Sequence, residues 1–141
     1  MTVGASDGSN DVANFCNGTG TVRPAGKPRG LWGGDPRNGY WRGVATSTLP
    51  DVATERLTDL MIAALDPTPG GRVLDIGCGV GKSATHLLTT SAMHVVGITI
   101  SETRLDQART RAAEAGVADR ATVQHADAMR MPFSGDSFDA A

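Results

Sequence analysis

One stretch constrains the fold of this chain more than any other: it runs from Arg72 to Ala84 and reads R-V-L-D-I-G-C-G-V-G-K-S-A. Its apolar first part predicts a buried strand, and glycines at every second position then predict a turn that leads into a helix. Glycine allows positive φ and has no Cβ to obstruct a ligand. Because the helix begins at once, its free N–H groups and positive dipole end face the turn. The stretch therefore predicts a site that holds a small polar ligand against bare backbone.

Two familiar phosphate-binding patterns fit this turn incompletely. A P-loop, G-x-x-x-x-G-K-[ST], is suggested by residues 81–83 but requires glycine at position 76, where the chain has Ile76. A dinucleotide site, G-x-G-x-x-G, accepts Gly77 and Gly79 but requires glycine in place of Lys82. It also expects an acid about 20 residues further on, at the end of the next strand, and the sequence lacks one there. Both patterns are therefore disfavoured.

A third pattern, acid-x-G-x-G-x-G, is met in full by Asp75, Gly77, Gly79 and Gly81. The bland alternative is a glycine-rich turn between a strand and a helix that binds nothing. Three glycines and an acid beside a helix start are more than such a turn requires. We therefore interpret the stretch as a ligand site.

The overall composition is that of an ordinary soluble domain. The chain has 141 residues, 40% of them hydrophobic, and a net charge of −2, which suits one domain and gives no basic excess for nucleic acid. No apolar run is long enough to predict a membrane span, and the N-terminus does not resemble a signal peptide. The two cysteines, Cys16 and Cys78, are far apart and in no metal-type spacing. We expect no metal site and a reduced, cytoplasmic setting.

The N-terminal part of the chain differs from the rest. Residues 1–30 are rich in Gly, Pro, Ser and Asn without periodicity, which predicts a disordered segment. Residues 31–50 contain both tryptophans and the only tyrosine, Tyr40, and form an aromatic arm. This arm either folds over a ligand pocket as a lid or only anchors the segment to the domain formed by residues 51–141. The sequence leaves both alternatives open.

Helical and strand periodicities alternate after position 50. Helices are predicted at 51–65, 81–90 and 102–115, and strands at 72–76, 94–100, 121–125 and, as an opening only, 137–141. This alternation predicts a parallel sheet, which binds ligands outside the carboxyl ends of its strands. Asp75, Thr99 and Asp127 lie at the ends of predicted strands, so we expect them along that edge.

Two of these helices carry further signals. The first has an apolar stripe at helical spacing and two candidate caps, Asp51 and Thr48. The stripe consists of Ala53, Leu57, Leu60, Met61 and Ala64. In the third helix, Ser101 is a fitting N-cap and Gly116 is placed to end the helix.

The acid-x-G-x-G-x-G pattern resembles the first motif of the class I methyltransferases that depend on S-adenosylmethionine (SAM). Further segments similar to this family follow in order: G-I-T-I-S at 97–101, H-A-D-A-M-R-M-P-F at 125–133 and D-S-F-D at 136–139. The set is most similar to the subgroup that methylates small molecules in natural-product, tocopherol and sterol pathways. That subgroup's N-terminal arm also resembles L-W-G-G…G-Y-W in this chain, so the resemblance covers roughly residues 31–141.

The resemblance implies that the glycine turn holds the methionine end of SAM. The groups involved are the Asp75 side chain and the backbone of Gly77, Cys78 and Gly79, with Gly81 completing the motif. For Cys78 we favour a small residue packed beneath the turn over a nucleophile, since no histidine lies near it in the sequence.

The resemblance also implies positions for the adenosine half of the cofactor. Thr99 lies at the ribose, where relatives often have an acid, and Ile100 lies beside the adenine. Asp127 accepts from the adenine amino group, and the backbone N–H of Ala128 meets the ring. The alternative for Asp127 is a carboxylate that only caps a loop.

Three more residues belong to the expected cofactor site or lie beside it. Ser101 is assigned to the site by the G-I-T-I-S segment, although it is a helix cap whatever the ligand. Tyr40, on the aromatic arm, offers a ring face that suits a sulfonium cation. Arg104 occupies the position where relatives often carry a glutamine that contacts the cofactor.

The implied fold is α/β and Rossmann-like, with a seven-stranded sheet in the order 3-2-1-4-5-7-6 in full-length relatives. This chain stops as the fourth strand begins, so we expect an N-terminal fragment truncated after about three parallel strands. The implied function is transfer of a methyl group from SAM to a small-molecule oxygen, carbon or nitrogen. No catalytic base can be named, and the acceptor and oligomeric state stay open. The alternatives are a non-catalytic SAM- or nucleotide-binding remnant and an NAD-type oxidoreductase.

Overall fold

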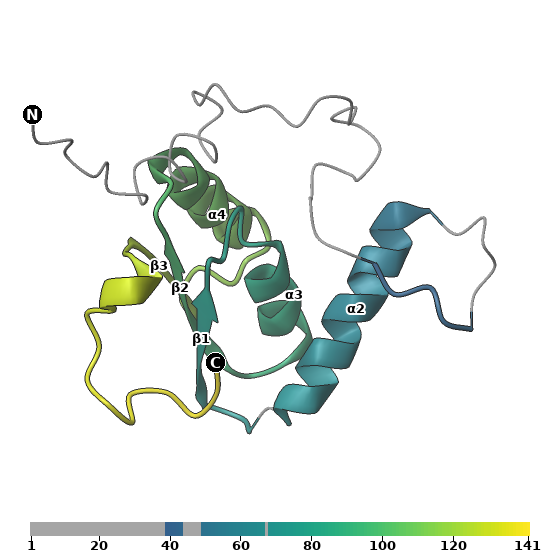
Figure 1. Ribbon diagram of the computed structural model, residues 1–141, viewed down its shortest axis with the longest axis horizontal. Helices are drawn as coiled ribbons and strands as arrows, with labels where there is room; N and C mark the ends of the chain where they lie inside the picture. Colours follow the sequence, from purple (N-terminus) through teal and green to yellow (C-terminus); the bar gives the residue numbers. More distant parts are fainter. Residues whose placement is uncertain (1–38, 44–48, 67) are drawn as a thin grey trace, which may run out of the picture. The chain divides into compact units, whose positions relative to one another are not determined.

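The computed structural model describes residues 39–43, 49–66 and 68–141 (Figure 1). The described residues belong to two units, one containing 39–66 and the other 68–141. The segment predicted to be disordered, and most of the aromatic arm, lie outside the described residues. Among the helices described, none combines the length and apolar character needed to cross a membrane.

The first unit is built around helix α2, Pro50–Leu65. Leu49 occupies the N-cap position without a side-chain cap bond, so the predicted cap at Asp51 is wrong, and Thr48 lies outside the described residues. Proline supplies the start instead, because its fixed φ suits the first helical turn and it has no N–H to satisfy. The N–H of Tyr40 donates to the carbonyl of Ala53 at 2.8 Å, which fastens residues 39–43 to the helix.

The predicted apolar stripe of α2 is only partly buried. Ala53 is buried, whereas Leu60 and Met61, which belong to the same apolar stripe, are 47% and 58% exposed. Thr54 and Thr58 are buried instead. Their hydroxyls donate to backbone carbonyls one helical turn earlier, at 2.7 and 3.1 Å, and a hydroxyl satisfied in this way is not costly to bury. Periodicity identified an apolar face but not the face that the fold covers.

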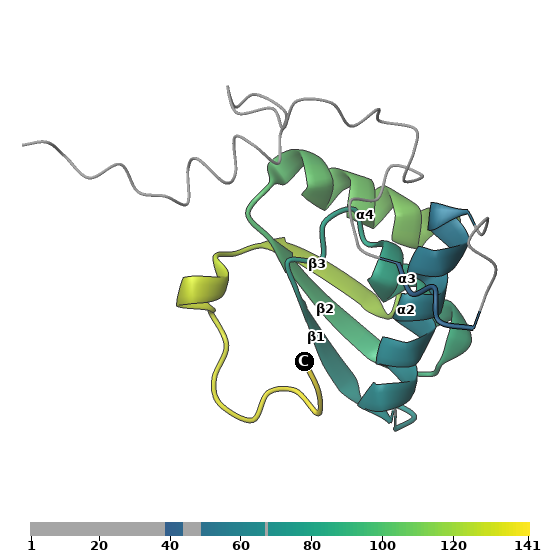
Figure 2. The ribbon, with the colours of Figure 1, turned by 45° about the vertical axis from the view of Figure 1, so that its right-hand side comes forward.

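The second unit is a three-stranded parallel sheet covered by helices. Its strands are β1 (Arg72–Ile76), β2 (His94–Thr99) and β3 (Ala121–His125), in that spatial order. Helices α3 (Lys82–Thr90) and α4 (Glu102–Glu114) connect them, and a short 3₁₀ helix, η1 (Ala128–Arg130), follows β3. Figures 1 and 2 show α3 and α4 on one face of the sheet and the segment after β3, in yellow, on the other. The predicted α/β fold with parallel strands is confirmed.

The sheet face beneath the helices is packed with small and branched side chains. Leu87 and Leu88 of α3 are buried, as are Ala108 and Ala112 of α4. All residues of β2 after His94 are buried, as its nearly unbroken apolar run predicted for a strand covered on both faces. This core holds α3 and α4 against the sheet. Each helix begins just after the carboxyl end of a strand, and the glycine turn lies between β1 and α3.

The opposite face of the sheet is covered by the chain that follows β3. Its buried cluster of Leu74, Val96 and Ile98 packs against Phe133 and Phe138, whose rings meet edge to face at 4.9 Å. Ala126 also packs against this cluster. The last residue of β1, Ile76, lies beyond the cluster and is 48% exposed, although the sequence predicted it to be buried.

The chain then returns to β1 and opens a fourth strand on its far side. The N–H of Leu74 donates to the carbonyl of Ala140 at 3.0 Å, and Val73 and Ala140 form a parallel bridge. Asp139 supports this junction, because its Oδ2 accepts from the N–H of Arg72 at 2.7 Å. Since β2 lies on the other side of β1, this single bridge lies where the order 3-2-1-4 places a fourth strand, as the resemblance implied.

Candidate functional site

The glycine turn has the left-handed backbone that its sequence predicts. Gly77, Gly79 and Gly81 have φ values of 76°, 54° and 73°. The N–H groups of Gly77 and Cys78 both donate to the carbonyl of Ile98, at 2.9 and 3.0 Å. These two bonds fasten the turn to β2, so its shape is set by the sheet.

The three glycines are not equivalent. A Cβ on Gly77 would have nothing within 4 Å, so this residue faces open space that a ligand can enter. A Cβ on Gly81 would lie 3.0 Å from the Cβ of Ala108, so this glycine lets α4 approach the turn. Gly81 is also the N-cap of α3 and provides no side-chain cap bond. The first N–H groups of α3 therefore supply a positive dipole end beside the turn.

Asp75 and Cys78 lie at the start of the turn. The Oδ2 atom of Asp75 is buried, and Asp75 is close enough to act electrostatically on the cysteine. Burial first, and the negative charge of Asp75 second, raise the pKa of the Cys78 thiol to about 12. The thiol is therefore neutral near pH 7 and unsuited to nucleophilic catalysis. Its position explains Gly97 as well, since a Cβ there would lie 2.9 Å from the Cys78 sulfur.

The space beneath the turn is too small for a ligand. A void of about 10 Å³ lies between the helices and the sheet, lined by Cys78, Gly81 and Gly97 among others. A single water molecule needs at least about 10–15 Å³. A ligand of the glycine turn must therefore lie on its outer surface.

The residues at the end of β2 and just after it cap the N-terminus of α4. The hydroxyl of Thr99 accepts from the N–H of Ser101 at 3.2 Å, and the hydroxyl of Ser101 accepts from the N–H of Arg104 at 3.3 Å. The N-cap predicted at Ser101 is confirmed. Ser101 has no exposed surface, so a direct contact with a ligand requires rearrangement, and its role at a cofactor stays a prediction.

The end of β3 is tied to the end of β2. His125 Nε2 lies 3.1 Å from the carbonyl oxygen of Ile100. Asp127 follows, and its Oδ1 accepts from the N–H of Met129 at 2.9 Å, which caps the turn η1 that Ala128 begins. A carboxylate has about four acceptor sites, so this capping bond is compatible with a ligand contact. The roles of Ile100, Asp127 and Ala128 toward adenosine stay predictions.

Arg104 also reaches the glycine turn. Its Nη1 lies 3.8 Å from the position that a Cβ on Gly79 would occupy. The signal in the sequence is its place three residues after the cap Ser101, in the first turn of α4. Tyr40 belongs to the other unit, where the Arg56 guanidinium lies 5.8 Å from its ring centre, and its contact with a cofactor stays a prediction.

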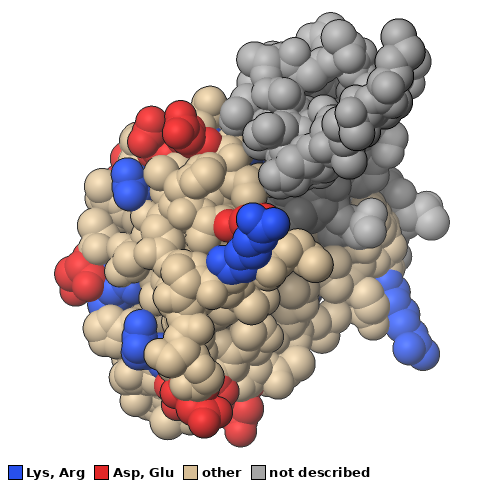
Figure 3. Space-filling view, turned by 60° about the vertical axis from the view of Figure 1, so that its left-hand side comes forward, with Lys and Arg blue, Asp and Glu red and all other residues tan. Residues whose placement is uncertain are grey.

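The described residues contain no candidate metal cluster, and the face in Figure 3 shows no large area of one charge. Within residues 39–43, 49–66 and 68–141, no group of three or more His, Cys, Asp or Glu side chains could hold a metal. On the face in Figure 3, acidic and basic side chains are scattered among uncharged ones. This face of the described residues thus has no large area of one charge.

The comparisons with known proteins agree with the family resemblance seen in the sequence. Residues 73–141 match a family described as "Methyltransferase domain". The 27-O-demethylrifamycin SV methyltransferase of Amycolatopsis mediterranei is 43% identical over 109 residues, which make up 77% of this chain and 39% of that protein. Over this region the chain is similar in sequence to the class I SAM-dependent methyltransferases. A second relative, 24-methylenesterol C-methyltransferase 2 of Oryza sativa subsp. japonica, is 42% identical over 90 residues, 64% of this chain and 24% of that protein.

Solved structures share the fold. The [4+2]-cyclase SpnF superposes with a TM-score of 0.69 at 33% identity, over 75% of this chain and 39% of SpnF. Geranyl diphosphate methyltransferase with GPP and sinefungin gives a TM-score of 0.72 at 20% identity, over 92% and 52% of the two chains, and this similarity concerns the fold alone. This chain spans about 39% of the length of the 27-O-demethylrifamycin SV methyltransferase.

Proposed function

We propose that this chain binds SAM on the outer surface of the Gly77–Gly81 turn, and that the whole protein transfers the SAM methyl group to a small-molecule oxygen, carbon or nitrogen. The observation that carries the proposal is the open, left-handed turn between Asp75 and the N-terminus of α3. It lies at the carboxyl edge of a parallel sheet, the edge where such sheets bind ligands. The relatives named as O- and C-methyltransferases support the reaction class.

The charges of the turn suit the methionine end of SAM. The carboxylate of Asp75 suits the ammonium group, since hydrogen bonds between charged partners are the strong ones. The bare backbone of Gly77 and Gly79 leaves room for the ligand beside it. Further along the edge, Thr99 and Ile100 suit the ribose and adenine, and the Asp127 carboxylate suits the adenine amino group.

The chain's own contribution to the reaction is to position the donor. When bound, SAM supplies a methyl group activated by its sulfonium. In-line transfer would require the acceptor atom, the methyl carbon and the sulfur to be held in one line. Holding the two reactants in this alignment is the catalytic effect that the glycine turn and Asp75 supply. An acceptor hydroxyl also needs a base for its proton.

Calorimetric titration with S-adenosylhomocysteine tests the proposal. We expect saturable binding to the folded chain, and a loss of affinity of about tenfold or more in Asp75→Asn, which removes a charge-assisted hydrogen bond. Asp106→Asn is the matched control, because this acid is 81% exposed and its ion-pair partner among the described residues is Arg109, at 4.0 Å. A folded chain that does not bind S-adenosylhomocysteine, or equal affinities for both variants, would refute the proposed site.

The similarity to SpnF favours one alternative reading. A relative at 33% identity is named as a [4+2]-cyclase, so the fold and this level of similarity do not fix the reaction. The alternative is a non-catalytic remnant that binds SAM or a nucleotide without transferring a methyl group. Incubation with SAM carrying a labelled methyl group and a panel of small hydroxylated acceptors separates the two. An NAD-type oxidoreductase is less well supported, because Lys82 stands where the dinucleotide pattern needs glycine.

The domain organisation belongs to the same proposal. We propose that residues 31–50 act as an arm that closes over the cofactor, with Tyr40 facing the sulfonium, and that residues 51–141 form the partial SAM-binding domain. Limited proteolysis with and without S-adenosylhomocysteine tests the arm. Protection of 31–50 by the ligand supports closure, and unchanged cleavage there contradicts it.

The free Cys78 thiol suits a reducing, cytoplasmic setting.

A further inference from the structure

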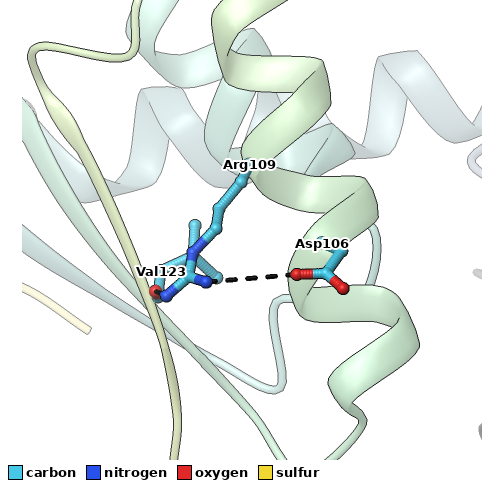
Figure 4. A network of polar contacts seen from close by, with 3 residues as sticks. All are labelled: Asp106, Arg109 and Val123. Carbon is cyan, nitrogen blue, oxygen red and sulfur yellow. Dashed lines mark hydrogen bonds and ion pairs between the residues drawn. The ribbon is translucent and has the colours of Figure 1, made fainter.

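The half-buried side chain of Arg104 differs from the other arginines of α4. Arg109 donates to the carbonyl of Val123 at 3.0 Å and lies near Asp106, as Figure 4 shows. Arg111 donates to the carbonyl of Val80 at 3.0 Å. The guanidinium of Arg104 has no hydrogen-bond or ion-pair partner within the described part of the chain. Partial burial of an unpartnered cation is unfavourable, so its position needs another explanation.

The position of Arg104 is also unfavourable for its own helix. It lies in the first turn of α4, where the positive end of the helix dipole favours acids such as Glu102 over cations. Its Nη1 instead reaches the open side of Gly79, at 3.8 Å from a Cβ placed there. A residue that weakens its helix and reaches an open turn is typical of a functional site.

We propose that Arg104 binds the α-carboxylate of the cofactor and makes the site selective for ligands that carry this group. The inference rests on the proposed function, because the carboxylate is the only anionic group of SAM. A guanidinium binds a carboxylate through two parallel hydrogen bonds. Asp75 and Arg104 then recognise the ammonium and the carboxylate of the same amino-acid end. A SAM analogue without its carboxylate should bind less tightly for two reasons. It loses the hydrogen bonds to Arg104, and the positive charge of Arg104 then repels the positive sulfonium.

Titration of the full chain with two ligands tests the carboxylate contact. S-Adenosylhomocysteine carries the amino-acid end, and 5′-methylthioadenosine lacks it. We expect Arg104→Gln to lower the affinity for S-adenosylhomocysteine about tenfold or more and to change the affinity for 5′-methylthioadenosine less than about twofold. Arg104→Lys should keep part of the selectivity, since it keeps the charge but loses the bidentate geometry. Arg109→Gln, the same change on the same helix, should leave both affinities unaltered.

The outcomes separate this inference from the proposed function. A wild-type chain that binds neither ligand refutes the proposed function and the inference together. A wild-type chain that binds both, with Arg104→Gln weakening both equally or neither, refutes the inference alone. If circular dichroism shows that Arg104→Gln does not fold, the affinities of the wild-type chain for SAM and for decarboxylated SAM are compared instead. Equal affinities for these two overturn the inference, and a preference for SAM of about tenfold or more supports it.

Discussion

Substituting alanine at two glycines of the turn should separate the role of the fold from the role of the ligand. Gly77 and Gly81 have nearly the same φ, 76° and 73°. Alanine at either position adopts a left-handed conformation that costs about 1–2 kcal/mol. The two positions differ in their surroundings, because a Cβ on Gly77 meets open space whereas one on Gly81 lies 3.0 and 3.2 Å from the Cβ and Cα of Ala108.

The contact with Ala108 sets the size of the difference. Over-packing a well-packed core costs about 1–3 kcal/mol. We therefore expect Gly81→Ala to lower the free energy of unfolding by about 2–5 kcal/mol, the sum of strain and over-packing. Gly77→Ala should lower it by only about 1–2 kcal/mol. For ligand affinity we expect the opposite order, with the larger loss in Gly77→Ala, because its new Cβ projects into the space assigned to the cofactor.

Urea unfolding followed by circular dichroism measures the first effect, and titration with S-adenosylhomocysteine measures the second. Gly135→Ala is the control, because a Cβ there has nothing within 4 Å and its φ is not positive. Equal destabilisation by the two turn variants would refute the packing argument. Undiminished affinity in a folded Gly77→Ala chain would refute the placement of the ligand over Gly77.

Three further predictions follow from single contacts. Cys78 should resist iodoacetamide at pH 8 and react only after unfolding, and a rapid reaction in the folded chain, read by peptide mass spectrometry, would contradict its burial. Folding raises the pKa of Cys78 from 9.0 to about 12. The stability that the protonated thiol contributes is therefore complete below pH 9 and is lost as the pH rises toward 12. Cys78→Ala should lack this pH dependence when the free energy of unfolding is measured by urea titration at several pH values. Arg120 donates to the carbonyls of Leu88, Ser91 and Met93 at 2.8, 2.7 and 3.2 Å, so Arg120→Ala should lower the free energy of unfolding by about 2–4 kcal/mol, and a loss under about 0.5 kcal/mol would contradict this role.

The sheet and its helices were predictable from the sequence because their signals are local. Strand β2 has an almost uninterrupted apolar run, and Ser101 and Gly116 mark the two ends of α4. The carboxyl edge follows from the alternation of strands and helices, which also places Asp75 and Asp127 correctly along the sheet. Family resemblance added the ligand and the expected fourth strand, and Ala140 beside β1 agrees with the latter.

Contacts between distant segments were not predictable in the same way. Nothing in the sequence near Arg120 indicates that it reaches three carbonyls around the junction of α3 and β2. The exposed Leu60 and Met61 show the same limit, since a helical period identifies a stripe but not its partner. The guanidinium of Arg104 stands out only when its neighbours on α4 are seen to have partners, which it lacks among the described residues.

The glycine turn is preorganised by elements that precede any ligand. Strand β2 holds it through the carbonyl of Ile98, and α4 holds it through the bond from Arg111 to the carbonyl of Val80 at 3.0 Å. The contact between Gly81 and Ala108 keeps the same helix close. A ligand on this turn does not have to order it, so less of the binding free energy is lost to conformational entropy. Glycine is then needed here for two separate reasons: Gly81 lets α4 fix the turn, and Gly77 keeps the fixed turn open.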